Sequence, residues 1–217
     1  MKVLSQDGYY FIEPGSGYLA CGYVAKGRME EPMQILSVIN KFFTQQKNVV
    51  KSSFSGKRAL VTAGPTVEVI DPVRYVSNRS SGKMGYAIAE ALRDKGAIVT
   101  LISGPTHLSL PEGINVVKVE SADDMFQAVT ERFAKQDIVI KAAAVSDYTP
   151  MDILEHKLKK QEGGLSVQFK RTKDILKYLG ENKTHQYLVG FAAETQNIEQ
   201  YALDKLKRKN ADVIISN

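Results

Sequence analysis

The sequence predicts an α/β fold in which helices cover both faces of a mainly parallel, doubly wound sheet in three layers. From Arg58 onward, short apolar segments alternate with amphipathic helical patterns. The apolar segments are continuous rather than alternating, which is typical of strands buried on both faces. Polar clusters follow their ends, as in sheets that bind ligands at the carboxyl edge. We therefore expect a Rossmann-like domain.

The elements of this domain follow in a regular order. Strands are expected at 59–62, 99–103, 115–119, 138–142, 187–191 and 213–216. Helices are expected between them, at 83–95, 122–135, 174–179 and 197–209. Ser121 and Asp124 have the spacing of a capping box at the start of the second helix. Met125, Val129 and Phe133 then recur at helical intervals and give that helix an inward face.

The two ends of the chain differ from this pattern. Residues 1–27 are rich in Gly and Tyr, and residues 30–46 read as one amphipathic helix. A polar stretch around Ser52 and Ser55 indicates a linker, so we place a domain boundary near Lys51. The last strand ends one residue before Asn217, where a doubly wound domain normally continues into a closing helix. We expect residues 51–217 to lack the C-terminal part of their domain.

Composition restricts the class of protein. The chain has 217 residues, is 43% hydrophobic and carries a formal charge of +5, which favours anionic partners. Its apolar runs are all shorter than the roughly 18–20 residues that a membrane helix needs. A signal-peptide layout is absent, and the single cysteine, Cys21, fits a reducing compartment. These observations predict a cytoplasmic protein.

The first polar cluster lies between the first strand and its helix. This connection is about twenty residues long, whereas such connections normally need about two to six. Its glycines, Gly64, Gly82 and Gly85, do not have the spacing of a dinucleotide fingerprint or of a P-loop. The cluster therefore reads either as the floor of an anion site or as a polar loop that caps a helix. The residues suited to anion binding are Arg74, Asn78, Arg79, Ser80, Ser81 and Gly82.

Later clusters follow the later strands. Small residues at 142–144 would let a ring or a sugar approach the backbone, and Asp147 suits ribose hydroxyls, a bound Mg²⁺ or a simple turn cap. The lysines at 157–160 read as a closing loop or as a solvated hairpin. Phe191 would stack a base. Lys205 and Lys209 share one helix face, which by itself would also fit a weak nucleic-acid patch. The three histidines lack metal-ligand spacing, so we expect no zinc site.

Together these clusters resemble the phosphopantothenate–cysteine ligase family, which joins phosphopantothenate to cysteine in coenzyme A synthesis. The resemblance covers about residues 57–217 and includes the form of the bacterial, CTP-using branch. The motifs that carry it are Gly64-Pro-Thr, Asp71-Pro-Val-Arg-Tyr-Val-Ser-Asn-Arg-Ser-Ser-Gly-Lys-Met-Gly85, Ala142-Ala-Ala-Val-Ser-Asp147, Lys157-Leu-Lys-Lys160, Lys173-Asp-Ile-Leu176, Gly190-Phe-Ala-Ala-Glu-Thr195 and Lys205 with Lys209.

The segment before the linker resembles a different family. The run from Gly15 to Gly22 and then Gly27-Arg-Met29 is similar to the tail of the flavin-dependent phosphopantothenoylcysteine decarboxylase, which many bacteria fuse ahead of the ligase. Cys21 matches that family's proton-donating cysteine. The flavin-binding core is absent from this sequence, so we expect FMN only where that domain is present, and no decarboxylation by residues 1–50 alone.

The ligase resemblance implies a two-step reaction. The phosphopantothenate carboxylate attacks CTP with Mg²⁺ to give an acyl-cytidylate, and the cysteine amine then forms the amide. It assigns Lys157 to the charge on the reacting phosphate, Asn78 to the acyl intermediate and Arg74 to phosphopantothenate. It also implies a homodimer, with no nucleic-acid or membrane partner. The residues expected at the nucleotide are Ser81, Gly82, Ala142, Ala143, Asp147, Lys160, Phe191, Lys205 and Lys209.

Two other classes of protein remain as alternatives. An NAD(P)-dependent reductase would use a Tyr-x-x-x-Lys pair, and Tyr201 and Lys205 have that spacing, although the required glycine fingerprint is missing. A nucleotide-binding fragment without catalysis is the second class. The ligase interpretation itself also allows this chain to be one part of a bifunctional decarboxylase and ligase.

Overall fold

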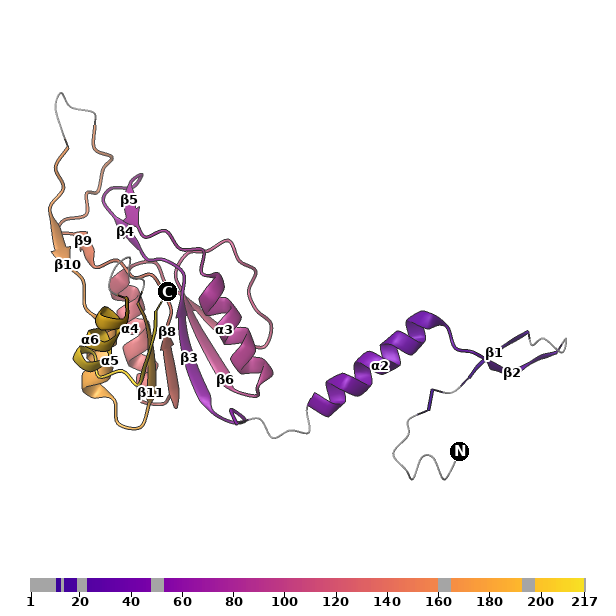
Figure 1. Ribbon diagram of the computed structural model, residues 1–217. Coiled ribbons are helices and arrows are strands. Elements are labelled where there is room, and N and C mark those ends of the chain that lie inside the picture. Colours follow the sequence, from indigo (N-terminus) through magenta and orange to yellow (C-terminus); the bar gives the residue numbers. More distant parts are fainter. Residues whose placement is uncertain are drawn as a thin grey trace. The chain divides into compact units, whose positions relative to one another are not determined.

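The computed structural model describes residues 11–12, 14–18, 23–47, 53–159, 165–192 and 198–216. The chain divides into two compact units, Met1–Lys51 and Ser52–Asn217, and the division coincides with the expected linker (Figure 1). In the first unit, β1 (Gly15–Tyr18) pairs antiparallel with β2 (Val24–Arg28). The helix expected at 30–46 is α2 (Pro32–Lys47).

The second unit is built on a six-stranded, fully parallel sheet with the order β12-β11-β8-β3-β6-β7. The chain starts at the centre with β3, moves outward to β7, returns beside β3 with β8 and moves outward again to β12. This is the doubly wound arrangement that the sequence predicts, and that prediction is confirmed. The strands are β3 (Arg58–Ala63), β6 (Ile98–Ser103), β7 (Asn115–Lys118), β8 (Ile138–Lys141), β11 (Tyr187–Ala192) and β12 (Val213–Ser216).

Helices cover both faces of this sheet. Helix α3 (Lys83–Asp94) packs on β3 and β6 on one face. Helices α4 (Ala122–Phe133), α5 (Ile175–Asn182) and α6 (Ile198–Arg208) lie on the other face (Figure 1). The capping box at Ser121 is present, because its side chain accepts from the Asp124 amide and the Asp124 carboxylate accepts from the Ser121 amide.

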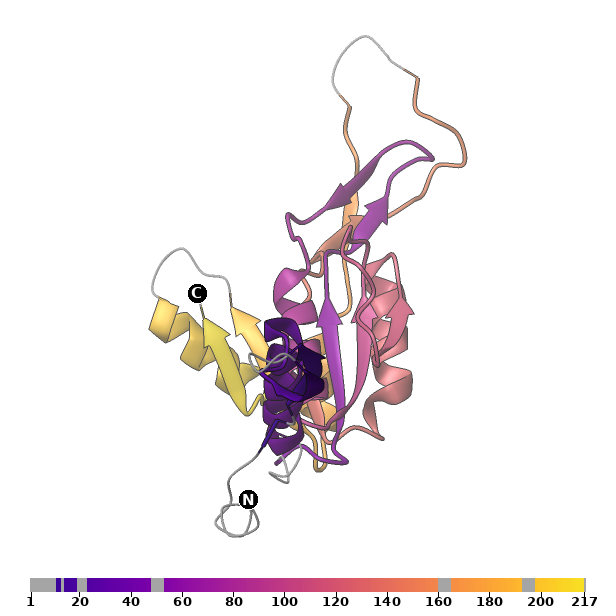
Figure 2. The same cartoon turned by 90° about the vertical axis from the view of Figure 1, so that its right-hand side faces the viewer.

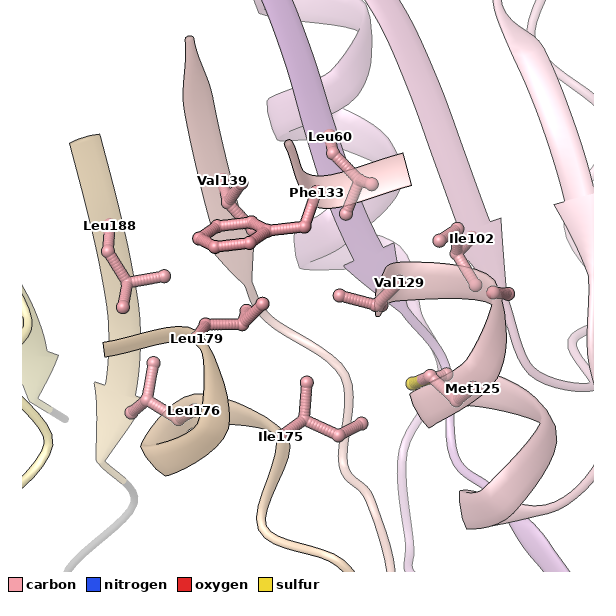
Figure 3. Close-up of a cluster of buried hydrophobic side chains, with 11 residues drawn as sticks. Leu60, Ile102, Met125, Val129, Phe133, Val139, Ile175, Leu176, Leu179 and Leu188 are labelled. Atoms are coloured by element: carbon pink, nitrogen blue, oxygen red, sulfur yellow. The ribbon is translucent and has the colours of Figure 1, made fainter. Parts of the chain in front are cut away.

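The strands separate two apolar clusters by simple alternation. Leu60, Val139 and Leu188 point to the face of α4 and α5, where they pack with Phe133 and Leu179 (Figure 3). Their side chains are fully buried, and each such burial stabilises the fold by roughly 1.5–3 kcal/mol. Residues such as Ala59 and Val61 point the other way, toward α3. Because side chains alternate along a strand, these core contacts determine on which face of the sheet the residues near the end of each strand lie.

Two antiparallel hairpins rise beyond the carboxyl edge of the sheet (Figure 2). The first, β4 (Val67–Val69) with β5 (Tyr75–Ser77), lies inside the connection that the sequence predicts to be one continuous loop, so that part of the prediction is wrong. The sequence Val67–Ser77 pairs because Ile70 and Asp71 donate their amides to the Arg74 carbonyl and close a tight turn. The second pairs β9 (Tyr148–Pro150) with β10 (Phe169–Arg171).

Within the described ranges, no helix is both long and apolar enough to cross a lipid bilayer.

Candidate active site

A pocket of about 610 Å³ lies at the carboxyl ends of β8 and β11, beside the start of α5 and the last turns of α6. The N-terminus of α5, the positive end of its helix dipole, lies at this edge and favours anions. The side chains that line the pocket come from Lys141, Ala143, Val145, Asp147, Tyr148, Arg171, Thr172, Lys173, Asp174, Ile175, Leu176, Lys177, Phe191, Lys205, Arg208 and Lys209.

The pocket unites residues that are far apart in the sequence. Five of the expected nucleotide residues line it together: Ala143, Asp147, Phe191, Lys205 and Lys209. Their common position follows from the sheet, because β8 and β11 are neighbours and α6 returns beside β11. Ala142 was also expected at the nucleotide, but it is not among the lining residues.

Sequence reasoning assigned no site role to six of the nine charged lining residues, among them Lys141 and Asp174. The sequence places Lys141 near the end of the strand expected at 138–142, and Asp174 at the start of a helix and in the motif Lys173-Asp-Ile-Leu176, without a site role for either. The signal for Asp174 was present, since it is the N-cap of α5 and accepts from the Lys177 amide at 2.9 Å. The signal for Lys141 was its place at the end of an apolar strand in the centre of the sheet, where a lysine is uncommon.

The pocket is strongly cationic. Seven lysine and arginine side chains line it against two carboxylates, those of Asp147 and Asp174. Asp174 is already shared, because it also pairs with the Lys209 ammonium. Burial acts to raise the pKa of Asp174, but the hydrogen bonds from Lys209 and from the Lys177 amide outweigh burial and hold that pKa below its usual value. The unbalanced positive charge suits a polyanionic ligand.

The loops that follow β3 and β8 are joined to each other. Pro65 and Ala144 form a parallel bridge, and the Ala144 amide donates to the Gly64 carbonyl at 2.9 Å. The hydroxyl of Thr66 accepts from the Ser146 amide at 3.0 Å, and that of Thr62 accepts from the Ala143 amide at 3.2 Å. We call these four contacts the β3–β8 loop seam. The seam fixes the backbone of residues 143–146 on one side of the pocket.

Asn78 sits against the same loop. Its side-chain amide donates to the carbonyls of Ala144 at 3.3 Å and Val145 at 3.1 Å. The first polar cluster and the second, which the sequence treats separately, therefore meet at this residue. Asn78 itself is not a lining residue of the pocket.

Arg74 and Lys157 are linked through a buried carboxylate. Asp71, 1% exposed, accepts from the Arg74 guanidinium at 3.0 Å and from the amides of Val73 and Leu158 at 2.8 and 3.2 Å. Burial acts to raise the pKa of Asp71, but these hydrogen bonds and the Arg74 charge together lower it below the usual range. The second Arg74 nitrogen donates to the Leu158 carbonyl at 3.3 Å. This cluster holds exposed Lys157 beside the first hairpin, outside the pocket.

The remaining expected residues lie elsewhere. Gly82 is the N-cap of α3 with a φ of 76°, and a Cβ there would stand 2.7 Å from the Thr106 methyl, so the position requires glycine. Ser81 precedes it, at the α3 side of the sheet, and neither residue lines the pocket. Lys160 and Cys21 lie outside the described residues.

Over the part of the chain that the structure describes, no group of three or more His, Cys, Asp or Glu is placed to hold a metal ion. Magnesium at nucleotide sites commonly needs only one or two carboxylates, because phosphate oxygens and water complete its shell. A pocket with two carboxylates fits Mg²⁺ that arrives bound to a triphosphate.

Fold and site together define a class: a Rossmann-like α/β protein with an anion-selective pocket at the carboxyl edge of β8 and β11. The comparison with known families narrows this class. Residues 54–217 match the family described as DNA/pantothenate metabolism flavoprotein C-terminal domain, and the chain belongs to that family. The family resemblance predicted from the motifs is therefore confirmed.

Two named relatives match along the whole chain. It is 55% identical to the coenzyme A biosynthesis bifunctional protein CoaBC of Bacillus subtilis (strain 168) over 218 residues, covering 100% of this chain and 53% of that protein. It is 47% identical to the protein of the same name from Haemophilus influenzae, again covering 100% of this chain and 53% of that protein. The chain thus spans about half the length of these relatives.

Solved structures agree with the fold. The crystal structure of the C-terminal domain of a coenzyme A biosynthesis bifunctional protein CoaBC is 52% identical and has a TM-score of 0.69, with 76% of this chain and 79% of that chain covered. A mutant of Cab2 in complex with phosphopantothenate-cysteine is 19% identical with a TM-score of 0.66, covering 87% of this chain and 80% of that one. At that identity the second likeness concerns the fold alone.

Proposed function

We propose that residues 51–217 carry a phosphopantothenate–cysteine ligase activity of coenzyme A biosynthesis and that CTP is the nucleotide. The observation that carries the proposal is the cationic pocket, in which Ala143, Asp147, Phe191, Lys205 and Lys209 line one cavity. The family membership and the names of the relatives support the same reaction. We also propose that the protein acts in the cytoplasm, a reducing compartment in which its single cysteine stays a thiol.

The reaction needs cations because an anionic carboxylate must attack an anionic triphosphate. In the first step the carboxylate oxygen of phosphopantothenate bonds to the α-phosphorus of CTP, and pyrophosphate leaves. In the second step the cysteine amine attacks the acyl carbon, CMP leaves and the amide forms. Lysines in a partly enclosed pocket offset this repulsion more strongly than they would in water. Mg²⁺, carried by the triphosphate, adds to the same effect.

The binding roles divide along the pocket. The ring of Phe191 stacks the base, Asp147 accepts from the ribose hydroxyls, and Lys205 and Lys209 bind phosphate oxygens. Two supports for the phosphates are the ammonium groups on one helix face and the N-terminus of α5 opposite.

The acyl substrate belongs to the neighbouring hairpin. Asn78 holds the acyl intermediate, and Arg74 binds phosphopantothenate while it stays paired with Asp71. Lys157 stands on the segment that the Asp71–Leu158 hydrogen bond ties to this hairpin, so it approaches the reacting phosphate from that side. For four further residues, a role in nucleotide binding is supported by the family resemblance alone: Ser81, Gly82, Ala142 and Lys160.

The first unit has a separate role in this proposal. Residues 1–50 are the tail of a flavoprotein decarboxylase domain, as in the bifunctional relatives, and FMN binds only where that domain is present. The ligase unit works as a homodimer, which the exposed apolar side chains of the first hairpin, Val73, Tyr75 and Val76, support.

Pyrophosphate release tests the function directly. We expect the chain to release pyrophosphate from CTP with Mg²⁺ and phosphopantothenate, and to form the amide and CMP once cysteine is added. The Lys205→Met change should lower this rate by about 100-fold, because it removes one charge from the triphosphate site. Lys207→Met is the matched control, since Lys207 lies on the same helix but does not line the pocket.

Three results would contradict parts of the proposal. Absence of pyrophosphate release with either CTP or ATP would exclude the ligase activity for this chain and leave the nucleotide-binding fragment. Faster release with ATP than with CTP would exclude CTP as the preferred nucleotide. Equal rates for wild type and Lys157→Gln would remove Lys157 from the reaction.

A further inference from the structure

Lys141 occupies an unusual position for a lysine. It is the last residue of β8, in the middle of the sheet, where it pairs in register with Thr62 of β3 and Gly190 of β11. Strand alternation puts its side chain on the same face as Val139, which packs in the core beneath α4 and α5. Lys141 also lines the pocket, so the pocket is the polar space that its ammonium can enter.

The charges that face this ammonium do not balance it. Asp174 comes from the N-cap of α5, and Asp147 comes from the segment after β8. Lys205 comes from α6 and Lys209 from the turn that follows α6. Asp174 is already engaged by Lys209 and by the Lys177 amide. No ion pair joins Lys141 to a carboxylate within the ranges that the structure describes. Further lining groups that titrate or carry charge are Tyr148, Arg171, Lys173, Lys177 and Arg208.

These surroundings weaken the charged form of Lys141. The pKa of Lys141 is lowered to about 8. Burial is the largest cause and Lys205 and Lys209 act in the same direction, while Asp174 and Asp147 oppose the change. An apolar side chain would suit the Val139 face better, and the two carboxylates compensate the ammonium only partly for its lost hydration. A bound ligand that carries negative charge would compensate the ammonium.

We propose that Lys141 is a specificity-determining residue of the pocket, which binds phosphate oxygens of the nucleotide from the floor and so selects the ligand by its charge. The inference rests on the proposed function, because it concerns the same pocket. Lys205 and Lys209 reach the phosphates from the end of α6 and the turn after it, whereas Lys141 reaches them from the central sheet. The three ammonium groups thus converge on one volume from two layers of the fold.

Binding should then be coupled to uptake of a proton. In the free protein about half of the Lys141 side chains are neutral at pH 8, since the pKa is about 8. Phosphate oxygens beside the amine favour its charged form, so the neutral fraction takes up a proton as the nucleotide binds. We expect an uptake of about 0.1 proton per CTP at pH 7, about half a proton at pH 8 and about 0.9 at pH 9. The phosphates of free CTP are fully ionised across most of this range and contribute little.

Calorimetric titration with Mg²⁺ and CTP, in buffers of differing ionisation enthalpy, measures this uptake at each pH. Wild type should show uptake that rises from pH 7 to pH 9 and an affinity that falls over the same range. Lys141→Met should abolish the uptake and weaken binding by about 10-fold at pH 7. Lys141→Arg should keep the affinity but abolish the uptake, because its guanidinium stays charged. Lys95→Met, an exposed lysine at the end of α3, should behave as wild type.

The outcomes separate this inference from the function. If wild type binds neither CTP nor ATP, the proposed function fails and the inference fails with it. If wild type binds CTP but Lys141→Met keeps the same uptake and affinity, only the inference is overturned. Thermal unfolding confirms that each variant is folded; if Lys141→Met does not fold, persistence of the uptake in Lys141→Arg overturns the inference.

Discussion

At the scale of single residues, the site depends on two charged side chains that the fold removes in part from water. Asp71 is a carboxylate satisfied by amides and by Arg74, so its burial orders two segments. Lys141 is an ammonium without such partners, so its burial opposes folding. The charge of Asp71 stabilises the fold, whereas the charge of Lys141 has a use only when an anionic ligand binds.

The Asp71→Asn change should loosen the segment around Leu158. It removes the charge from the acceptor and turns one of its oxygens into an amide that faces donors. Hydrogen exchange should show faster exchange of the Leu158 amide, and ligase activity should fall because Lys157 is adjacent. Asp152→Asn, an exposed carboxylate on the same segment, is the control. Unchanged protection of the Leu158 amide would contradict the role of Asp71.

The same carboxylate predicts a pH dependence. Its pKa is lower in the folded chain than in the unfolded chain, so its stabilising effect is complete above the unfolded value near 3.9. The effect is lost as the pH falls further, through the lowered pKa of the folded state. The difference in stability between wild type and Asp71→Asn should therefore be constant from pH 5 to 7 and shrink below pH 4, as measured by urea unfolding.

Lys141→Met should stabilise the protein at neutral pH by about 1–3 kcal/mol, because the lowered pKa of Lys141 is a penalty on its charged form. The unfolded chain binds this proton more tightly than the folded chain, so the penalty is complete below pH 8 and shrinks as the pH rises from about 8 to about 10.5. Urea unfolding of both proteins at pH 6.5, 7.5 and 9.5 measures it. A variant less stable than wild type at pH 7.5 would be the opposite result.

At the scale of elements, the closeness of α5 to the end of α6 shapes the pocket. Gly180 in α5 lies so near that a Cβ on it would stand 1.8 Å from the Lys209 carbonyl oxygen. Asn210, just after α6, donates its side-chain amide to the Gly180 carbonyl at 2.8 Å. Together with the Asp174–Lys209 pair, these contacts set the position of the α6 lysines relative to the start of α5.

Gly180→Ala should therefore weaken nucleotide binding although residue 180 does not line the pocket. The new methyl group must push the end of α6 away and carry Lys209 out of position. We expect at least a 10-fold rise in the dissociation constant for CTP, measured by calorimetry. Gly56→Ala is the control for an added methyl group without a clash: its Cβ would enter open space, and its φ of 76° adds backbone strain far from α6. Equal affinities for Gly180→Ala and wild type would show that α6 tolerates the displacement.

The sequence allows the main elements to be predicted but not the hairpins. All six strands of the sheet were expected to within one residue at each end, because continuous apolar runs identify buried parallel strands. β4, β5, β9 and β10 are only three residues long, and the last three carry exposed apolar side chains, so neither length nor periodicity marks them. The α5 helix was expected to end at residue 179, but Gly180 continues it to Asn182.

Much of the pocket was predictable from the order of motifs, and its remaining parts were not. Ala143, Asp147 and Phe191 follow strands that are neighbours in any doubly wound sheet. The contacts of Thr62 and Thr66 with amides about eighty residues later leave no pattern in the sequence. Asn78 was expected at the acyl substrate, whereas its link to Ala144 and Val145 depends on a hairpin that the sequence did not predict.

At the scale of the whole molecule, the second unit contains the complete described sheet and both apolar clusters. We expect residues 52–217 alone to unfold cooperatively with the same thermal midpoint as the full chain, because the core is confined to that unit. Circular dichroism of the two proteins tests this. A lower midpoint for the shorter protein would show that residues 1–51 stabilise the sheet.

The β3–β8 loop seam has a consequence for the ligands that the fold accepts. In dinucleotide-binding sheets of this topology, the pyrophosphate crosses the crevice between the first and fourth strands. In this protein the loops on either side of that crevice are hydrogen-bonded to each other. A dinucleotide bound across the crevice would have to break the Ala144–Gly64 and Ser146–Thr66 hydrogen bonds. The open pocket lies one strand further out, between β8 and β11. The seam therefore turns a fold suited to redox cofactors toward mononucleotides, which argues against the reductase alternative.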